Sequence, residues 1–407
     1  MAEAEAEAQA ERAVTDYAST ITIEQLDADP YAVFARLRVE APFTYVPAAN
    51  AWFVSRWDDV DELYAASDLV SSLQPHSPSQ QVMGVPNILT AEGPTHADLR
   101  GALHHMMLPK TVNSYVDAIV QPQVDAGLER ISGQREVDLL EEFLEPISVM
   151  STATLLGMGH LDPQDLRRWF ADLAVGSTNW ERDPVKDETA RVAVEESASA
   201  LADIYDRLEA EPDDSLISAL LHTGMPPGVT RERTYIEPTI LVILLGGLQE
   251  PAHGAGNVLL SLLRHPDQLS RVLDRPAQLM PKAINEGLRW EPPAGTVEKA
   301  AQQDFTFRGQ QVRRHDNILF MNGSVNRDAD HFVDGESFDV FRRESKHRAF
   351  GLGHHLCMGH WFSRRLIDIS LTRLLDAHPG MSLDPAHANR LEGWVFRGPR
   401  EGLHVLL

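Results

Sequence analysis

Apolar residues recur at spacings of three and four along most of this 407-residue chain, which is the periodicity of amphipathic α-helices. The pattern holds over residues 59–66, 100–107, 112–128, 137–156, 164–173, 189–209 and 216–222. Short alternating or β-branched runs predict strands over 43–46, 52–55, 305–308 and 402–406. We therefore predict a mainly α fold with minor β, in which small peripheral sheets border a single large helical domain.

The domain plan is simple, because residues 16–407 contain no Pro/Gly/Ser linker, internal repeat or abrupt change in composition. Residues 1–15 start with alternating Ala and Glu and have neither a basic region nor an apolar stretch, which predicts a disordered tail and no signal peptide or membrane anchor. The most apolar run, 240–248, is far shorter than the roughly 20 residues that span a bilayer. We expect a cytoplasmic protein.

The charge balance limits the partners. The chain has 36 Lys and Arg against 60 Asp and Glu, a net charge of −24, whereas nucleic acids and anionic lipids attract basic patches. We therefore expect no nucleic-acid or membrane partner. We also expect a monomer. The hydrophobic share of 43% allows a large core, as in an ordinary globular enzyme.

A long apolar segment, 238–263, reads as one buried helix interrupted by Gly246, Gly247 and Pro251. Glycine costs about 1 kcal/mol and proline about 3 kcal/mol in a helix interior. Two interpretations are open at this point. A ligand crosses close to the backbone, or the helix kinks against a neighbouring helix.

Cys357 is the only cysteine, which excludes an internal disulfide and a multi-cysteine metal site. A lone cysteine is usually a small buried hydrophobe. This one lies in a glycine-rich loop, 349–359, that opens a helix predicted over 360–375, where backbone N–H groups can stabilise a thiolate. A thiolate on heme iron favours O–O cleavage. Glycines such as Gly351 let the loop pass close under a flat macrocycle, and Phe350 can cover the sulfur.

Five residues of this loop, Phe350, Gly353, His355, Cys357 and Gly359, fill every fixed place of the signature Phe-x-x-Gly-x-His-x-Cys-x-Gly. In this the sequence resembles the cytochrome P450 family. The resemblance implies the cytochrome P450 fold, heme b (iron protoporphyrin IX) as cofactor, Cys357 as the axial ligand of the iron, and monooxygenase activity.

Glu286 and Arg289 match the Glu-x-x-Arg pair of that family, at i and i+3 on one helix face. Alone, such a pair is usually an exposed ion pair of little energetic value. Upstream of the cysteine loop it resembles the buried structural lock of the family, joined by Arg342.

The resemblance also assigns the heme propionates to His96, Arg100 and His355. Lys299 stands where the family usually has an arginine, and it supplies the charge but not the planar fork. We expect an exposed or half-exposed contact worth about 0.2–1 kcal/mol.

The interrupted helix departs from the family pattern. Most members carry Ala-Gly-x-Asp/Glu-Thr, an acid–alcohol pair that relays protons, whereas residues 246–250 read Gly-Gly-Leu-Gln-Glu. Gln249 is an amide at the acid position and Glu250 a carboxylate at the alcohol position. With the Pro-x-His-Gly of 251–254 and the segment 393–399, this resembles bacterial aromatic O-demethylases that act on guaiacol and related methoxyphenols.

By this resemblance the substrate is a small methoxylated phenol of the guaiacol or syringol type, demethylated to a phenol plus formaldehyde. The substrate pocket is expected to be lined by small, apolar and aromatic side chains, which are equally common in cores: Gly246, Ala294, Val297, Val395, Phe396 and Phe170.

The oxidant is either O₂ with a ferredoxin or flavin reductase, or H₂O₂ deprotonated by Glu250 and oriented by Gln249. Other interpretations stay open. Glu250 merely pairs with a cation such as His253; the protein is a reductase-dependent hydroxylase of another small hydrophobic substrate; or it is a non-catalytic heme-binding protein.

Overall fold

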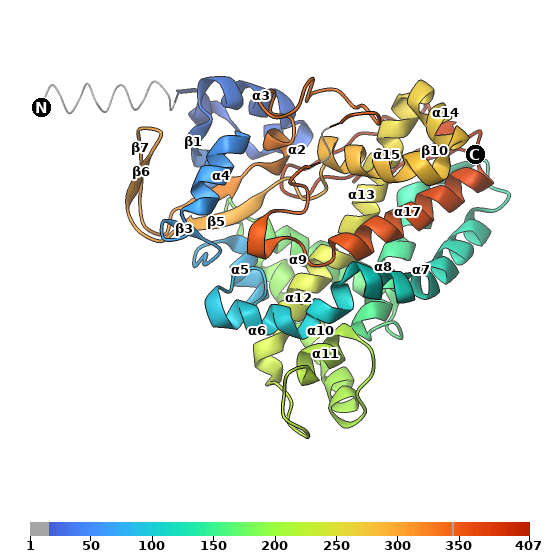
Figure 1. The fold of residues 1–407 in the computed structure, drawn as a ribbon, viewed down its shortest axis with the longest axis horizontal. Helices are drawn as coiled ribbons and strands as arrows, with labels where there is room; N and C mark the ends of the chain where they lie inside the picture. The colour runs from blue at the N-terminus through green and yellow to red at the C-terminus, as the bar shows by residue number, and fades with distance from the viewer. Residues whose placement is uncertain (1–15, 344–345) are drawn as a thin grey trace, which may run out of the picture.

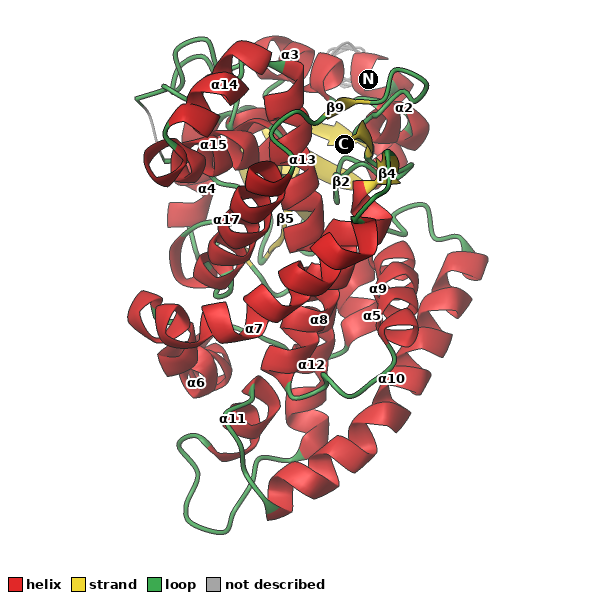
Figure 2. Ribbon diagram, turned by 90° about the vertical axis from the view of Figure 1, so that its right-hand side faces the viewer, coloured by secondary structure: helices red, strands yellow, loops and turns green. Residues whose placement is uncertain are grey.

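The computed structural model describes residues 16–343 and 346–407, so the tail predicted over 1–15 lies outside the described residues. Helices make up most of the structure and the strands form small sheets (Figures 1 and 2). The mainly α fold with minor β is thereby confirmed. In the described part of the chain, no helix combines the length and the apolar character needed to cross a membrane.

Twelve helices of at least seven residues follow the N-terminal α2 (Ile23–Ala28) and α3 (Tyr31–Glu40) within the described ranges. They are α4 (Trp57–Ala65), α6 (Gly93–His104), α7 (Pro109–Ile131), α8 (Glu145–Leu156), α9 (Pro163–Ser177), α10 (Pro184–Ala210), α11 (Leu216–His222), α12 (Arg233–Leu248), α13 (Glu250–Arg264), α14 (Pro266–Asp274), α15 (Pro276–Trp290) and α17 (His360–Ala377). Short helices α5 (Pro78–Met83) and α16 (Asn322–Val325) lie between them.

The prediction of one α-helix over 137–156 is wrong for the residues before Glu145. Residues Glu136–Asp138 form strand β4, Leu140–Leu144 make a π-helical turn, and α8 begins only at Glu145. Val137 pairs with Val405 near the C-terminus, and a long-range strand pairing overrides the local helical periodicity. The predicted helix over 100–107 also has different bounds in the structure, because α6 starts earlier, at Gly93.

The larger sheet has five strands in the order β1-β2-β8-β5-β3. These are β1 (Phe43–Val46), β2 (Ala51–Val54), β8 (Asn317–Phe320), β5 (Val297–Ala301) and β3 (Val70–Ser71). The β2–β8 pair is parallel and the others are antiparallel. A second sheet joins β4 to β10 (His404–Leu406) and β9 (Ser382–Leu383), and β6 (Phe305–Phe307) with β7 (Gln310–Val312) makes a hairpin. The five-stranded sheet lies toward the opposite end of the molecule from α10 and α11 (Figure 2).

The interrupted helix is present as α12 and α13, separated by Gln249. Nearly all of α13 is buried, and it packs against α15 and α17. The Cβ that a residue other than glycine would place at Gly254 lies 3.1 Å from Leu288 and 3.2 Å from Ile367, so a small residue lets the three helices approach. α17 also runs beside α7 (Figure 1), so the helix that follows the cysteine loop is held by contacts with α7, α13 and α15.

Candidate active site

The cysteine loop is a tight turn in front of α17. The Cys357 N–H donates to the Phe350 carbonyl (2.8 Å), and Gly351 and Gly353 adopt positive φ angles of 73° and 61°. A Cβ at Gly353 would lie 1.6 Å from the Tyr64 hydroxyl oxygen, so this position excludes every side chain. Gly353 of the signature therefore has a steric reason in this chain, whereas a Cβ at Gly359 would meet no atom of the described residues within 4 Å.

The Cys357 thiol is accessible, although protein atoms surround it and hold it out of bulk water. This burial raises the pKa of the thiol, while the backbone N–H groups of Gly359 and His360 and the nearby Arg100 guanidinium lower it. Arg100 donates to the Leu356 carbonyl (2.9 Å), beside the cysteine. Burial outweighs these contacts, so the net shift of the pKa is upward, and the N–H groups and Arg100 only partly offset it.

His96 on α6 and His355 in the cysteine loop face one another with ring centroids 4.3 Å apart. Both Nε2 atoms are buried, and neither has a hydrogen-bond partner among the described residues. Burial lowers the pKa of His96 to about 4, so its imidazole is neutral near pH 7. The two rings can therefore offer N–H groups to a common acceptor.

Glu92 lies next to these histidines. Its Oε1 is 3.3 Å from His355 Nε2 without hydrogen-bond geometry, and its Oε2 is 2.9 Å from His354 Nε2. The three side chains together have the donor set of a metal site. His354, however, has its other ring nitrogen bound to the Tyr64 hydroxyl (2.9 Å), so contacts within the protein account for it.

Lys299, on β5, is buried, with 4% of its surface exposed, and its ammonium donates to the Ser72 hydroxyl. Burial lowers its pKa to about 8, opposed by Glu92. The expectation of an exposed or half-exposed contact is therefore wrong, because the sheet covers the lysine stem. The side chain lines a cavity of about 440 Å³ that Tyr64, Glu92 and His354 also line.

The two glycines of the interrupted helix have different surroundings. A Cβ at Gly247 would lie 2.9 Å from Thr152 Cγ2, and the Thr152 hydroxyl donates to the Gly247 carbonyl (2.6 Å). A Cβ at Gly246 would meet no atom of the described chain within 4 Å, and Gly246 is exposed although Leu245 and Leu248 are buried. Gly247 thus lets α12 pack closely against α8, which agrees with the helix-packing interpretation. Gly246 faces open space, which agrees with the interpretation that a ligand lies close to the backbone.

Glu250 is 9% exposed, and neither of its carboxylate oxygens has a hydrogen-bond partner within residues 16–343 and 346–407. The nearest basic side chain shown is that of His253, whose Nδ1 is 3.8 Å from Oε1, beyond hydrogen-bond distance. Burial raises the pKa of Glu250, and His253 and Arg400 oppose the rise. The His253 pairing considered from the sequence is therefore present only as a long contact.

Gln249 lies at the break between the helices, and its amide nitrogen donates to the carboxylate of Glu145 at the start of α8. The sequence did not point to Glu145, because it is 104 residues away and its position before Pro146 is that of an ordinary acidic residue in the first turn of a helix.

Three of the six residues predicted to line a substrate pocket, Ala294, Val395 and Phe396, come together. Ala294 forms an isolated β-bridge with Phe396, and the Gly295 N–H donates to the Val395 carbonyl (2.8 Å). A Cβ at Gly351 would be 3.9 Å from Val297 Cγ2, which places Val297 close to the cysteine loop. The remaining two come from helices that pack together, Gly246 on α12 and the buried Phe170 on α9.

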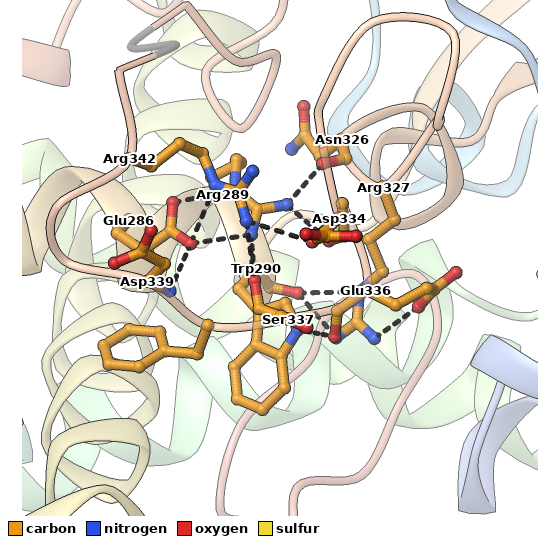
Figure 3. A network of polar contacts seen from close by, with 12 residues as sticks. Glu286, Arg289, Trp290, Asn326, Arg327, Asp334, Glu336, Ser337, Asp339 and Arg342 are labelled. Atoms are coloured by element: carbon orange, nitrogen blue, oxygen red, sulfur yellow. Dashed lines mark hydrogen bonds and ion pairs between the residues drawn. The ribbon is translucent and has the colours of Figure 1, made fainter.

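The predicted lock is a buried network on α15 (Figure 3). Arg289 binds both oxygens of Glu286 (2.7 and 2.8 Å), and Arg342 Nε donates to Glu286 at 3.2 Å. Arg289 also donates to the carbonyls of Asn326, Gly335 and Ser337. The Asn326 side chain in turn accepts from the Arg348 N–H (2.7 Å), so the network reaches the start of the cysteine loop.

Comparisons with known proteins agree with this geometry. Residues 277–378, which contain the lock and the cysteine loop, match the family described as Cytochrome P450. The 6-deoxyerythronolide B hydroxylase of Saccharopolyspora erythraea is 28% identical over 385 residues, 89% of this chain and 93% of that protein. The chain is thus similar to cytochrome P450 proteins over most of its length. The biotin biosynthesis cytochrome P450 of Bacillus subtilis is 25% identical over 91% of this chain and 94% of its own length.

Among solved structures, the cytochrome P450 enzyme CxnD for C–S bond formation in chuangxinmycin biosynthesis has a TM-score of 0.83 and 26% identity, covering 94% of this chain and 95% of that chain. The predicted cytochrome P450 fold is thereby confirmed. The family is one of monooxygenases, and its cofactor is heme b.

The residues present fit that cofactor. Cys357 offers an accessible sulfur beside backbone N–H groups, and the buried, unpaired Nε2 atoms of His96 and His355 suit a propionate. Arg100 and Lys299 would supply positive charge there, with Gly351 and Phe350 under the ring. The open space at Gly246 would lie on the opposite, substrate-binding side.

Replacing the buried Lys299 with Ala is expected to weaken heme binding by about 1.5–3 kcal/mol, because a hydrogen bond to a buried charged group contributes this much. Heme transfer to a scavenging apoprotein measures the effect as a faster dissociation rate. Lys282→Ala, which removes an exposed lysine, is the matched control and should leave the rate unchanged. Equal rates in both variants would remove Lys299 from the propionate contacts.

Proposed function

We propose that this cytochrome P450 catalyses the oxidative O-demethylation of a small methoxylated phenol, with guaiacol and syringol as candidate substrates. The observation that carries the proposal is the buried Glu250, whose carboxylate has no hydrogen-bond partner among the described residues and stands where most members carry an alcohol. Burying such a group without partners is costly, and carboxylates placed in this way are often functional.

The surroundings of Glu250 support a small, flat substrate. Gly246 leaves room beside the helix backbone, and the bridge between Ala294 and Phe396 brings an aromatic ring next to a methyl-sized side chain. Val297 lies close to Gly351 of the cysteine loop. A single substituted benzene ring suits these residue types, with Phe396 packing against its face or edge.

When bound, heme b supplies the oxidation of the methyl C–H bond that leads to a hemiacetal. The hemiacetal collapses to a phenol and formaldehyde, so that a methoxyphenol and H₂O₂ give a phenol, formaldehyde and water. The protein orients the methyl group and excludes water from it.

The proposed role of Glu250 is proton transfer to and from the oxidant. With H₂O₂, its carboxylate oxygen takes a proton from one peroxide oxygen and returns it to the oxygen that leaves as water, which a threonine hydroxyl cannot do at neutral pH. Gln249 orients the peroxide. The other source of oxidant is O₂ with electrons from a ferredoxin or flavin reductase, and both routes give the same products.

A panel of ligands tests the substrate class. We expect guaiacol and syringol to shift the ferric optical spectrum to the high-spin form at lower concentrations than a terpene, a fatty acid or a macrolide, because the proposed pocket suits one aromatic ring. Formaldehyde release with H₂O₂ or a reductase is the second measurement.

The panel also separates the other candidates. Tight binding of a large hydrophobic ligand, with hydroxylation of that ligand, would favour a hydroxylase, the activity named for the relative from Saccharopolyspora erythraea. Binding without turnover under either oxidant would indicate a non-catalytic heme protein.

A further inference from the structure

Glu145 carries a buried negative charge that the roles assigned above do not use. Only 6% of the residue is exposed, and it opens α8 directly after the π-helical turn Leu140–Leu144. One carboxylate oxygen accepts from the Gln249 amide and the other from the Arg167 guanidinium. Arg167, on α9, is about one-third exposed, so the carboxylate joins the interior of the protein to its surface.

We propose that Glu145 is the positioning residue of Gln249, fixing the orientation of its side-chain amide next to Glu250. This inference rests on the proposed function, because it concerns the groups that handle the oxidant. At the break between α12 and α13 the chain carries an amide, Gln249. Glu145 of α8 brings a carboxylate to that amide.

The orientation follows from hydrogen-bond chemistry. An ionised carboxylate only accepts, so the amide must present its NH₂ group to Glu145 and cannot be turned over. The amide carbonyl and the second N–H are then fixed in direction, as a group that orients a peroxide requires. Without the hydrogen bond to Glu145, the oxygen and the nitrogen of the Gln249 amide could exchange places.

The Arg167 guanidinium offsets the free-energy cost of burying the Glu145 carboxylate. An unpaired buried carboxylate costs several kcal/mol, and a guanidinium in contact with it offsets that cost. A second contact fixes the backbone on the same side of the break, since Thr152 of α8 holds the Gly247 carbonyl. Two residues of α8 thus determine where the end of α12 and the Gln249 amide lie.

The test compares ferrous–CO complexes by infrared spectroscopy, because the C–O stretch responds to polar groups beside the bound ligand. We expect one main band in the parent protein and at least two bands in Glu145→Gln, since an amide at 145 satisfies either orientation of Gln249. Gln249→Leu should give one shifted band, and adding Glu145→Gln to it should change nothing further.

Turnover provides the second readout. Peroxide-driven demethylation by Glu145→Gln should have a kcat lower by roughly 10- to 100-fold, the usual cost of a misplaced group, with the substrate dissociation constant unchanged. Glu141→Gln, which removes an exposed carboxylate four residues earlier, is the matched control and should behave as the parent. Arg167→Gln, at the surface, keeps the test informative if Glu145→Gln fails to fold, and should broaden the CO band.

The inference would be overturned if Glu145→Gln left the CO band unaltered. If that variant does not fold, an unaltered band in Arg167→Gln would have the same meaning. A CO band that Gln249→Leu does not shift would also overturn it. The failure of the proposed function has a different signature. In that case the CO bands respond as described while neither guaiacol nor syringol releases formaldehyde.

Discussion

Replacing Glu250 with Gln is expected to reduce peroxide-driven formaldehyde release from guaiacol and syringol by about 10²–10⁴-fold, the usual contribution of general acid–base catalysis. The amide has nearly the same volume but cannot take a proton from peroxide. Because burial raises the pKa of Glu250, the parent rate should increase with pH over a range higher than that of a free glutamate, as the carboxylate ionises. The variant should lose this pH dependence.

Glu250→Thr separates the two oxidants. We expect it to lose most peroxide-driven turnover as well, while both variants keep the spin-state shift with substrate and the CO spectrum. A gain in O₂-dependent turnover with a reductase would show that this position selects the oxidant. Equal peroxide rates in the parent and both variants would mean that Glu250 is only a structural partner of His253.

Cys357→Ser is expected to abolish the red-shifted Soret band of a thiolate-bound ferrous–CO complex, because a hydroxyl at this position does not supply the strong electron donation of a thiolate. The chain should still fold, since the lock of Glu286, Arg289 and Arg342 lies outside the substitution and holds the segment before the loop. Circular dichroism provides the folding control. Persistence of the band would mean that another residue binds the iron.

Much of the fold was predictable because helical periodicity is a local property. The positions of α7, α9, α10 and α11 follow directly from apolar spacing. The prediction was wrong at Val137, whose strand partner Val405 comes from the other end of the chain, and no local pattern reports such a pairing.

The site shows the same division. The signature around Cys357 and the pair Glu286–Arg289 could be found through the resemblance to the cytochrome P450 family, because both are short local motifs. The burial of Lys299 could not, since it depends on Ser72 and the folded sheet. Glu145 was not predictable either, because its partner Gln249 is brought to it only by the packing of α8 against α12.

Removal of the methyl group of a methoxyphenol is the reaction that we propose for this chain. The most direct test uses heme-loaded protein with H₂O₂ and guaiacol carrying an isotopic label in the methyl carbon, followed by mass spectrometry of both products. We predict labelled formaldehyde and unlabelled catechol in equal amounts. A ring-hydroxylated product that retains the labelled methyl group, without formaldehyde, would contradict the account.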